Sequence, residues 1–306
     1  MTVPEGDLGG HLCQRTPCRN SRLGQRCRIH VSDDIKKIDL EKEINSLFAG
    51  EADCALFFFS GHGYIDTFGG YIVTSDYNST NIGVKMKDIL NVANKSKCKN
   101  RIIILDCCYS GSMGKQNRSM STSTISDGLT VLSACRDYEK AIECGEHGLF
   151  SSLLINGLKG EAADLLGEIT PGNIYAYIDR TLGPWEQRPV FKTNISKFIS
   201  LRKVKEPISR DDLHEIIKLF EMSDTELYLD PSFEFTNDPN YNIEIIEPHA
   251  NPDNVNKLKI LQRLESVGLV KPIDEKHLYF AAMHSKRCKL TESGKYYWNL
   301  VTRNRI

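Results

Sequence analysis

The order of apolar and polar positions predicts an open α/β sheet in the first two thirds of the chain. Three short segments, 55–59, 101–105 and 129–133, are mainly apolar and have the length of strands. Their apolar residues are consecutive rather than alternating, which is typical of strands buried on both faces of a parallel sheet. Helix-forming segments lie between them, so right-handed crossovers should place helices on both faces.

The individual elements follow from the same pattern. Helices are predicted at 39–48, 84–93, 149–158 and 174–182, and a last strand at 198–201. The side of the first helix that faces the core is expected to carry Ile35, Ile38, Ile44, Leu47 and Phe48. Residues 1–27 show neither helical nor strand periodicity and are predicted to be a poorly structured leader, which leaves 28–204 as the sheet domain.

The remainder of the chain differs in charge. Residues 205–249 hold 3 basic and 12 acidic residues, a net charge of −9, and are predicted to be an acidic linker or helical segment. Residues 250–306 hold 11 basic and 5 acidic residues, a net charge of +6. There, a helix at 255–267, short strands at 269–273 and 278–280, and a helix capped by Thr291 have the order of a small winged-helix module. This module is expected to contact a regulatory protein partner rather than nucleic acid.

Composition limits the cellular locations and the classes of ligand that are expected for this protein. The formal net charge of −1 argues against a whole-chain polyanion binder. No apolar segment approaches the ~20 residues of a membrane span, and the first residues lack the apolar core of a secretory signal. A cytoplasmic protein is therefore expected, with its 10 cysteines as thiols. Because the spacing of His11, Cys13, Cys18, Cys27 and His30 matches no common zinc module, no metal or other cofactor is predicted.

Candidate chemistry follows two successive strands. His62 comes after the strand at 55–59, and Cys107 and Cys108 come after the strand at 101–105. Because the carboxyl ends of neighbouring parallel strands lie at one edge of a sheet, an imidazole and a thiol should meet there. A histidine can make a cysteine thiol nucleophilic, and the N–H of Gly63 could point at a developing oxyanion.

Each motif alone also has a simpler interpretation. A histidine between two glycines is often only a turn residue, and two cysteines after an apolar strand are usually small buried apolar residues. The occurrence of both motifs at consecutive strand ends favours a Cys-His active site. A backbone carbonyl would suffice to orient the imidazole, so a dyad is predicted.

These residues resemble those of the caspase and metacaspase group of cysteine peptidases over about residues 28–203. The resemblance rests on Ser-Gly-His-Gly at 60–63 and Asp-Cys-Cys-Tyr-Ser-Gly at 106–111, each after an apolar strand. It is closest to the prokaryotic, metacaspase-like branch. It implies a caspase-like three-layer α/β sandwich and peptide cleavage through a thioester, with Cys108 as nucleophile and His62 as base. Cys107 would then be tucked into the strand.

The resemblance also implies a substrate preference. Asp106 would line an acidic pocket for the P1 side chain, so that cleavage follows arginine or lysine, and Ser60 would line the same pocket. Asp106 could instead cap the N-terminus of the following helix, and both roles could hold together. In the polar loop at 112–128, Lys115 and Arg118 would be self-cleavage sites. Some members of the group require calcium, but no acidic cluster here can be assigned to it.

The leader marks a departure from the family. Nothing before Arg28 resembles the hydrophobic first strand of the family domain, so the sheet is expected to lack that strand and to expose an apolar edge. The leading prediction is a cysteine endopeptidase that acts on protein and peptide substrates. The alternatives are a catalytically inactive caspase-like scaffold or regulator that acts through its C-terminal module, and a winged-helix nucleic-acid binder.

Overall fold

A computed structural model describes residues 34–110, 125–136, 143–144, 147–183, 187–241 and 245–306. The chain forms two compact units: Met1–Ala163 with Ile169–Lys203, and Asp164–Glu168 with Val204–Ile306. Among the described residues, no helix combines the length and the apolar character that crossing a membrane requires.

A four-stranded sheet in the order β1-β5-β6-β10 forms the centre of the first unit. Its strands are β1 (Cys54–Ser60), β5 (Asn100–Asp106), β6 (Leu129–Ser133) and β10 (Val190–Asn194). The strands β1, β5 and β6 are parallel, as their unbroken apolar sequences predict, whereas β10 runs antiparallel to β6. The prediction of a last strand at 198–201 is wrong, and the last strand of this sheet is β10 instead. The strand β10 was not predicted because it is half-exposed and has too few consecutive apolar residues.

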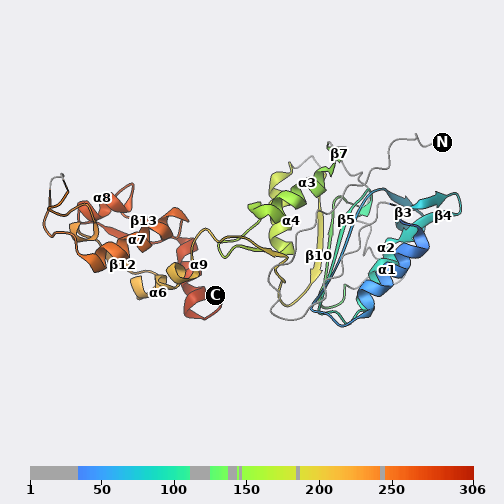
Figure 1. The fold of residues 1–306 in the computed structure, drawn as a ribbon, viewed down its shortest axis with the longest axis horizontal. Coiled ribbons are helices and arrows are strands. Elements are labelled where there is room, and N and C mark those ends of the chain that lie inside the picture. The colour runs from blue at the N-terminus through green and yellow to red at the C-terminus, as the bar shows by residue number, and fades with distance from the viewer. Residues whose placement is uncertain (1–33, 111–124, 137–142, 145–146, 184–186, 242–244) are drawn as a thin grey trace. The chain divides into compact units, whose positions relative to one another are not determined.

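Helices cover both faces of this sheet (Figure 1). The helices α1 (Lys37–Ala49) and α2 (Met86–Lys95) lie on one face, and α3 (Leu149–Asn156) and α4 (Pro171–Thr181) lie on the other. The helix α3 continues into a π-helical turn, η2 (Gly157–Glu161). The predicted three-layer α/β arrangement is thus confirmed.

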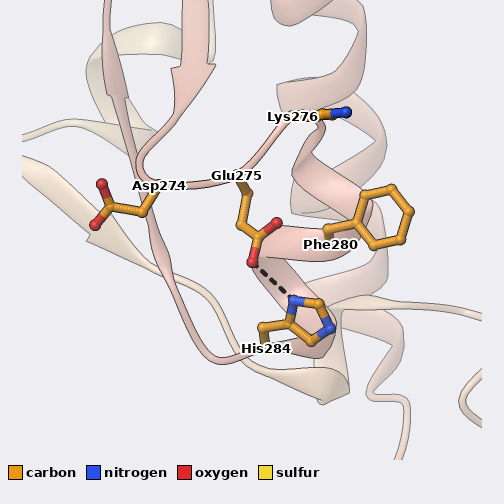
Figure 2. Close-up of a pocket in the computed structure, with 5 residues that line it drawn as sticks. All are labelled: Asp274, Glu275, Lys276, Phe280 and His284. Carbon is orange, nitrogen blue, oxygen red and sulfur yellow. Dashed lines mark hydrogen bonds and ion pairs between the residues drawn. The ribbon is translucent and has the colours of Figure 1, made fainter.

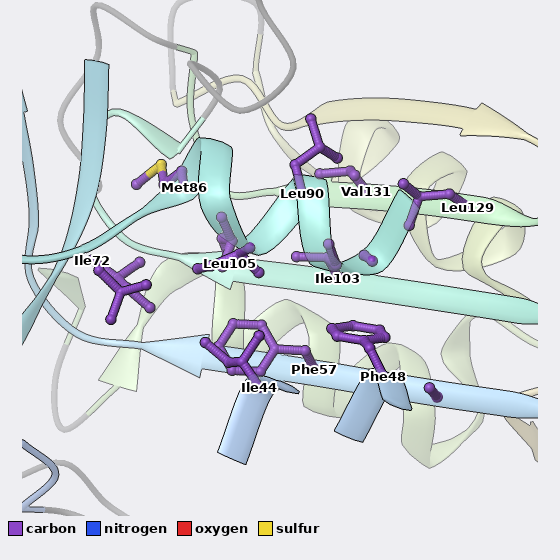
Figure 3. Packing of buried hydrophobic residues seen from close by; sticks show 14 of the residues in the cluster. Ile44, Phe48, Phe57, Ile72, Met86, Leu90, Ile103, Leu105, Leu129 and Val131 are labelled. Atoms are coloured by element: carbon purple, nitrogen blue, oxygen red, sulfur yellow. The ribbon is translucent and has the colours of Figure 1, made fainter. Parts of the chain in front are cut away.

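The core between α1, α2 and the sheet is built from aliphatic and aromatic side chains (Figure 3). The helix α1 buries Leu40, Ile44 and Phe48, which recur every four residues and so share one face. Ile38 was expected on the same side, but it lies off this row and is 73% exposed. On the strand β1, Leu56 and Phe58 point to the other face and are 41% and 43% exposed.

A second, smaller sheet follows β1 directly. It contains the antiparallel strands β2 (Gly63–Asp66), β3 (Gly69–Asn78) and β4 (Asn81–Lys85). The sequence pattern did not predict it, since its strands are interrupted by glycine and polar residues. Because β4 includes Val84, the helix predicted from residue 84 begins only at Met86. Two further pairs of short strands are present. One pair is β7 (Glu143–Cys144) with β8 (His147–Gly148), and the other is β9 (Glu168–Ile169) with β11 (Arg202–Lys203).

The second unit is an α+β structure around a three-stranded antiparallel sheet. The sheet has the order β12-β14-β13, formed by β12 (Glu226–Tyr228), β14 (Arg287–Leu290) and β13 (Val270–Pro272). Its helices are α5 (Arg210–His214), α6 (Ile216–Leu219), the 3-10 turn η3 (Pro231–Phe233), α7 (Pro252–Ser266), α8 (Leu278–Met283) and α9 (Glu292–Thr302).

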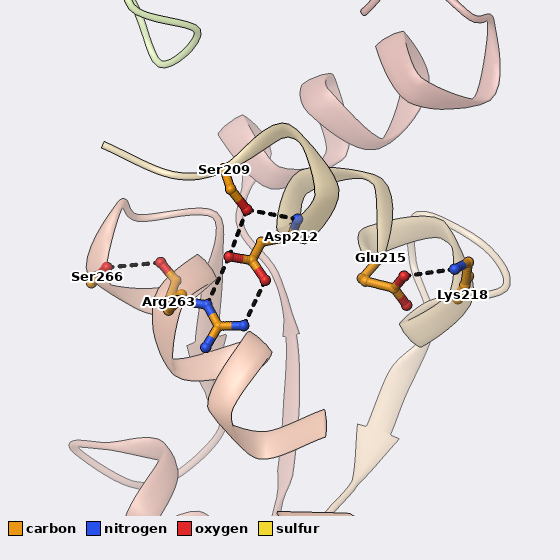
Figure 4. Close-up of polar contacts among 6 residues, drawn as sticks. All are labelled: Ser209, Asp212, Glu215, Lys218, Arg263 and Ser266. Carbon is orange, nitrogen blue, oxygen red and sulfur yellow. Dashed lines mark hydrogen bonds and ion pairs between the residues drawn. The ribbon is translucent and has the colours of Figure 1, made fainter. Parts of the chain in front are cut away.

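Residues 205–249 belong to this unit and do not form a separate linker. Leu213 and Phe220 from the acidic segment are buried in one core with Leu261 from α7. Arg263 of α7 also holds Asp212 of α5 by two hydrogen bonds, 2.8 Å from Nε to Oδ2 and 2.5 Å from Nη2 to Oδ1 (Figure 4). This contact lowers the pKa of Asp212 below its usual value. The opposite charges of 205–249 and 250–306 thus meet inside a single unit.

Two predictions for the C-terminal elements have opposite outcomes. The cap of the last helix is confirmed, since Thr291 Oγ1 accepts a hydrogen bond from the Gly294 N–H at 3.0 Å. The strand predicted at 278–280 is wrong: these residues begin α8, where tertiary packing buries Leu278 completely and overrides the strand preference of its aromatic neighbours. The winged-helix assignment stays a prediction.

Candidate active site

The paired ends of β1 and β5 bring the histidine and cysteine motifs together. The two strands are parallel, and Ser60 at the end of β1 pairs with Asp106 at the end of β5. The Gly61 N–H donates a hydrogen bond to the Asp106 carbonyl oxygen at 3.1 Å, so the two backbones remain hydrogen-bonded just past the last strand pair. His62 and Cys108 each lie two residues past this pair. The expectation that these strands are neighbours is therefore confirmed.

Gly63 lies directly against the backbone of Cys108. A Cβ atom at position 63 would be 2.0 Å from the Cys108 carbonyl oxygen and 3.1 Å from the Cys108 nitrogen, so only glycine permits this approach. The preceding residue is fixed by β3, because the Val73 N–H donates to the His62 carbonyl oxygen at 2.9 Å. The His62 side chain is exposed. The backbone of 62–63 is therefore held next to the cysteine turn while the imidazole faces outward.

The two adjacent cysteines occupy different environments. Cys107 is 1% exposed, and burial raises the pKa of its thiol well above the usual value, so it stays protonated. Cys108 is only partly buried. The next residue, Tyr109, has a φ of 59°, in the left-handed region that non-glycine residues rarely adopt. This turn ends the strand abruptly and leaves Cys108, rather than Cys107, accessible.

A third cysteine, Cys135, packs beneath this turn. Its Sγ donates a hydrogen bond to the Cys107 carbonyl oxygen at 3.3 Å and lies 3.6 Å from Ser110 Oγ. Burial raises the pKa of Cys135, while hydrogen bonds from Ser110 and Tyr109 oppose that rise, so the thiol remains a proton donor. Sequence reasoning missed this residue. The available signal was its position two residues after β6, the third strand of the same parallel sheet.

Asp106 points towards the beginning of α3. Its carboxylate is 5% exposed, and Oδ2 accepts a hydrogen bond from the Ser151 N–H at 3.1 Å. A Cβ on Gly148 would approach that oxygen to 2.6 Å, so the tip of the helix closes around the carboxylate. Burial raises the pKa of Asp106, against the effect of its hydrogen bonds from Ser151. Asp106 thus caps α3, the first helix predicted after it, and Ser60 beside it is exposed.

Several predicted candidates lie outside the described residues. These are the self-cleavage candidates Lys115 and Arg118 and the five histidine and cysteine residues His11, Cys13, Cys18, Cys27 and His30.

The second unit offers a different kind of site. A shallow hollow is lined by Asp274, Glu275, Lys276, Phe280 and His284 (Figure 2). The Nδ1 atom of His284 lies 2.7 Å from Glu275 Oε1, and the His284 ring stacks on Phe280 with 6.0 Å between ring centroids. None of the residues that line it carries a thiol or hydroxyl group. The strand ends of the first unit are therefore the better candidate for nucleophilic chemistry.

Comparison with known proteins identifies the first unit. A model of the peptidase C14 caspase domain matches residues 21–197. Among solved structures, a protein of Geobacter sulfurreducens is similar over 53% of this chain and 74% of its own, with 15% identity and a TM-score of 0.38. Caspase-1 of Spodoptera frugiperda is similar over 56% of this chain and 73% of its own, with 13% identity and a TM-score of 0.39. No curated protein matches the sequence. On the strength of the domain match, the chain belongs to the caspase-domain family of cysteine peptidases.

Proposed function

We propose that this protein is a metacaspase-like cysteine endopeptidase in which Cys108 is the nucleophile and His62 the general base and acid. The observation that carries the proposal is the contact between the Gly63 and Cys108 backbones at the paired ends of β1 and β5. It holds an exposed imidazole and a partly buried thiol on neighbouring segments.

The dyad would act by covalent catalysis. His62 removes the thiol proton of Cys108, and the thiolate sulfur attacks the carbonyl carbon of the scissile peptide bond. The N–H groups of Gly63 and Cys108 would stabilise the resulting oxyanion. His62 then gives its proton to the leaving amine, and a thioester remains. Water, deprotonated by His62, hydrolyses the thioester and regenerates the thiol.

We further propose that the enzyme cleaves after arginine or lysine. Asp106 supplies a buried carboxylate whose pKa is raised by burial, so its charge is poorly solvated. A cationic P1 side chain would offset that cost, with Ser60 as a further lining residue. This preference would make Lys115 and Arg118 self-cleavage sites. Residues 250–306 would bind a regulatory protein partner.

Turnover of peptides with arginine, lysine or aspartate at P1, with and without calcium, tests the proposal. Cleavage after the basic residues alone is expected. Cleavage after aspartate would overturn the role given to Asp106. If the folded protein cut no peptide under either condition, the alternative of a catalytically inactive regulator would replace the peptidase.

The substitution Asp106→Asn separates substrate recognition from helix capping. The asparagine carbonyl oxygen can still accept the Ser151 N–H, and a buried charge is removed, so Tm should be unchanged or raised. We expect kcat/KM for peptides with arginine at P1 to fall about ten- to a hundredfold, because a charged contact contributes about 1.5–3 kcal/mol. Unchanged turnover together with a lower Tm would leave Asp106 with the capping role alone.

The substitutions Cys135→Ala and Cys135→Ser test whether the thiol positions the cysteine turn. Alanine removes the donor to the Cys107 carbonyl oxygen, whereas a serine hydroxyl can replace it. We expect Cys135→Ala to lower kcat about three- to tenfold with little change in KM, as one net hydrogen bond contributes about 0.5–1.5 kcal/mol. Cys135→Ser should recover most of kcat. Equal kcat values for alanine and serine would mean that Cys135 only fills space.

A further inference from the structure

A row of aromatic side chains crosses the small sheet next to the candidate dyad. Tyr64 of β2 pairs with Tyr71 of β3, which pairs with Lys85 of β4. The two tyrosine rings are tilted, with centroids 6.4 Å apart. The Nζ atom of Lys85 lies 5.8 Å from the ring centroids of both Tyr71 and Phe68. We call these four residues the aromatic row.

The aromatic row and the His62 side chain share one face of the strand. The hydrogen bond from Val73 to the His62 carbonyl oxygen continues the β2–β3 pairing back to His62. Residues i and i+2 of a strand point to the same face, so Tyr64 lies roughly 7 Å along from His62 on its outward side. The opposite face holds Ile72, which is completely buried in the core.

The row is open to solvent where it approaches the histidine. Tyr64 is 42% exposed, and Phe68 at the far end is 77% exposed. Large apolar rings held rigidly by cross-strand neighbours lose little conformational freedom when they bind a ligand. The exposed rings of Tyr64 and Phe68 therefore suit an apolar side chain, whereas the charged Lys85 lies on β4 beside Tyr71 and Phe68.

The chemistry of the dyad determines which part of a substrate reaches this surface. His62 must give its proton to the leaving amine, so the segment on the leaving-group side of the scissile bond lies over the imidazole. We propose that Tyr64, with the aromatic row behind it, forms a subsite for an apolar or aromatic side chain in the first two residues after the scissile bond. This inference rests on the proposed function.

Quenched peptides with a fixed arginine at P1 test the subsite. The residues after the scissile bond are varied between phenylalanine, leucine, glycine and aspartate, and kcat/KM is measured for each. The wild-type protein should prefer phenylalanine or leucine over glycine about fivefold, as expected for one aromatic contact. Tyr64→Ala should abolish that preference, and Tyr64→Phe, which keeps the ring, should retain it.

A matched control is available in the same sheet. Tyr77 of β3 is 50% exposed but lies six residues beyond Tyr71, outside the aromatic row. Tyr77→Ala should keep the preference for apolar leaving-group residues, with a Tm that shows a folded protein. Loss of the preference in both variants would overturn the assignment to Tyr64.

The outcomes separate the subsite from the peptidase itself. Equal rates for all leaving-group residues, with cleavage still after arginine, would refute the subsite and leave the proposed function standing. Failure of the wild-type protein to cut any of these peptides would refute the proposed function.

Discussion

Replacing Cys108 with alanine should abolish peptide cleavage, whereas replacing Cys107 should not. Cys108 is the accessible thiol beside Gly63, while Cys107 is fully packed and its raised pKa keeps it a neutral thiol. Loss of a nucleophile that acts together with a histidine lowers kcat by about 10⁴-fold or more. Turnover of a peptide with arginine at P1 by Cys108→Ala, Cys107→Ala and the wild-type protein measures the difference.

Stability distinguishes a chemical from a structural loss in these variants. Cys108→Ala should keep the Tm of the wild-type protein because its side chain is only partly buried. Cys107→Ala empties part of a packed site and should cost about 1 kcal/mol of unfolding free energy while it retains turnover. If Cys107→Ala were inactive at an unchanged Tm and Cys108→Ala were active, the assignment of the nucleophile would be reversed.

The substitution Gly63→Ala should damage both the fold and the activity. The new methyl group would lie 2.0 Å from the Cys108 carbonyl oxygen, so either β2 or the cysteine turn must move. Overpacking of this kind costs about 1–3 kcal/mol of unfolding free energy. A displacement of roughly 1 Å between reacting groups can lower the rate about a hundredfold. Thermal unfolding and kcat/KM measure the two effects.

Gly50 provides the matched control for that substitution. It follows α1 with a φ of −89°, and a Cβ placed there meets no atom within 4 Å. Gly50→Ala should therefore leave both Tm and kcat/KM close to those of the wild-type protein. A similar loss in both variants would show that the effect at Gly63 does not come from its approach to Cys108.

The parallel strands could be predicted because burial on two faces leaves a clear mark in the sequence. Ile103 and Val131 lie in apolar segments whose strands, β5 and β6, are buried along almost their whole length. The strand β1 is an exception, because Phe57 is buried whereas Leu56 and Phe58 on its other face are exposed. The sheet β2-β3-β4 leaves no such mark, since its stability comes from cross-strand pairs such as Tyr64 with Tyr71. The helix α8 could not be predicted from local preference because its packing in the second unit decides its conformation.

The meeting of the histidine and cysteine segments could be predicted from strand order alone. The motifs follow consecutive strands, and consecutive parallel strands are usually neighbours. The roles of Cys135 and of the tip of α3 could not be predicted in this way. Each depends on how a segment distant in sequence packs against the turn at Cys107 or the carboxylate of Asp106.

The division of the chain gives the second unit an unusual attachment. The polypeptide passes between the units after Ala163, after Glu168 and after Lys203. A protease that cut only after Lys203 would break the covalent connection to 204–306, while 164–168 would stay packed in the second unit without a peptide bond to it. Leu165 and Leu166 of 164–168 pack against the core of the second unit. A shortened chain that ended at Lys203 would therefore expose both leucines to solvent. The second unit therefore contains a segment from within the caspase domain, 164–168, as well as the residues that follow Lys203.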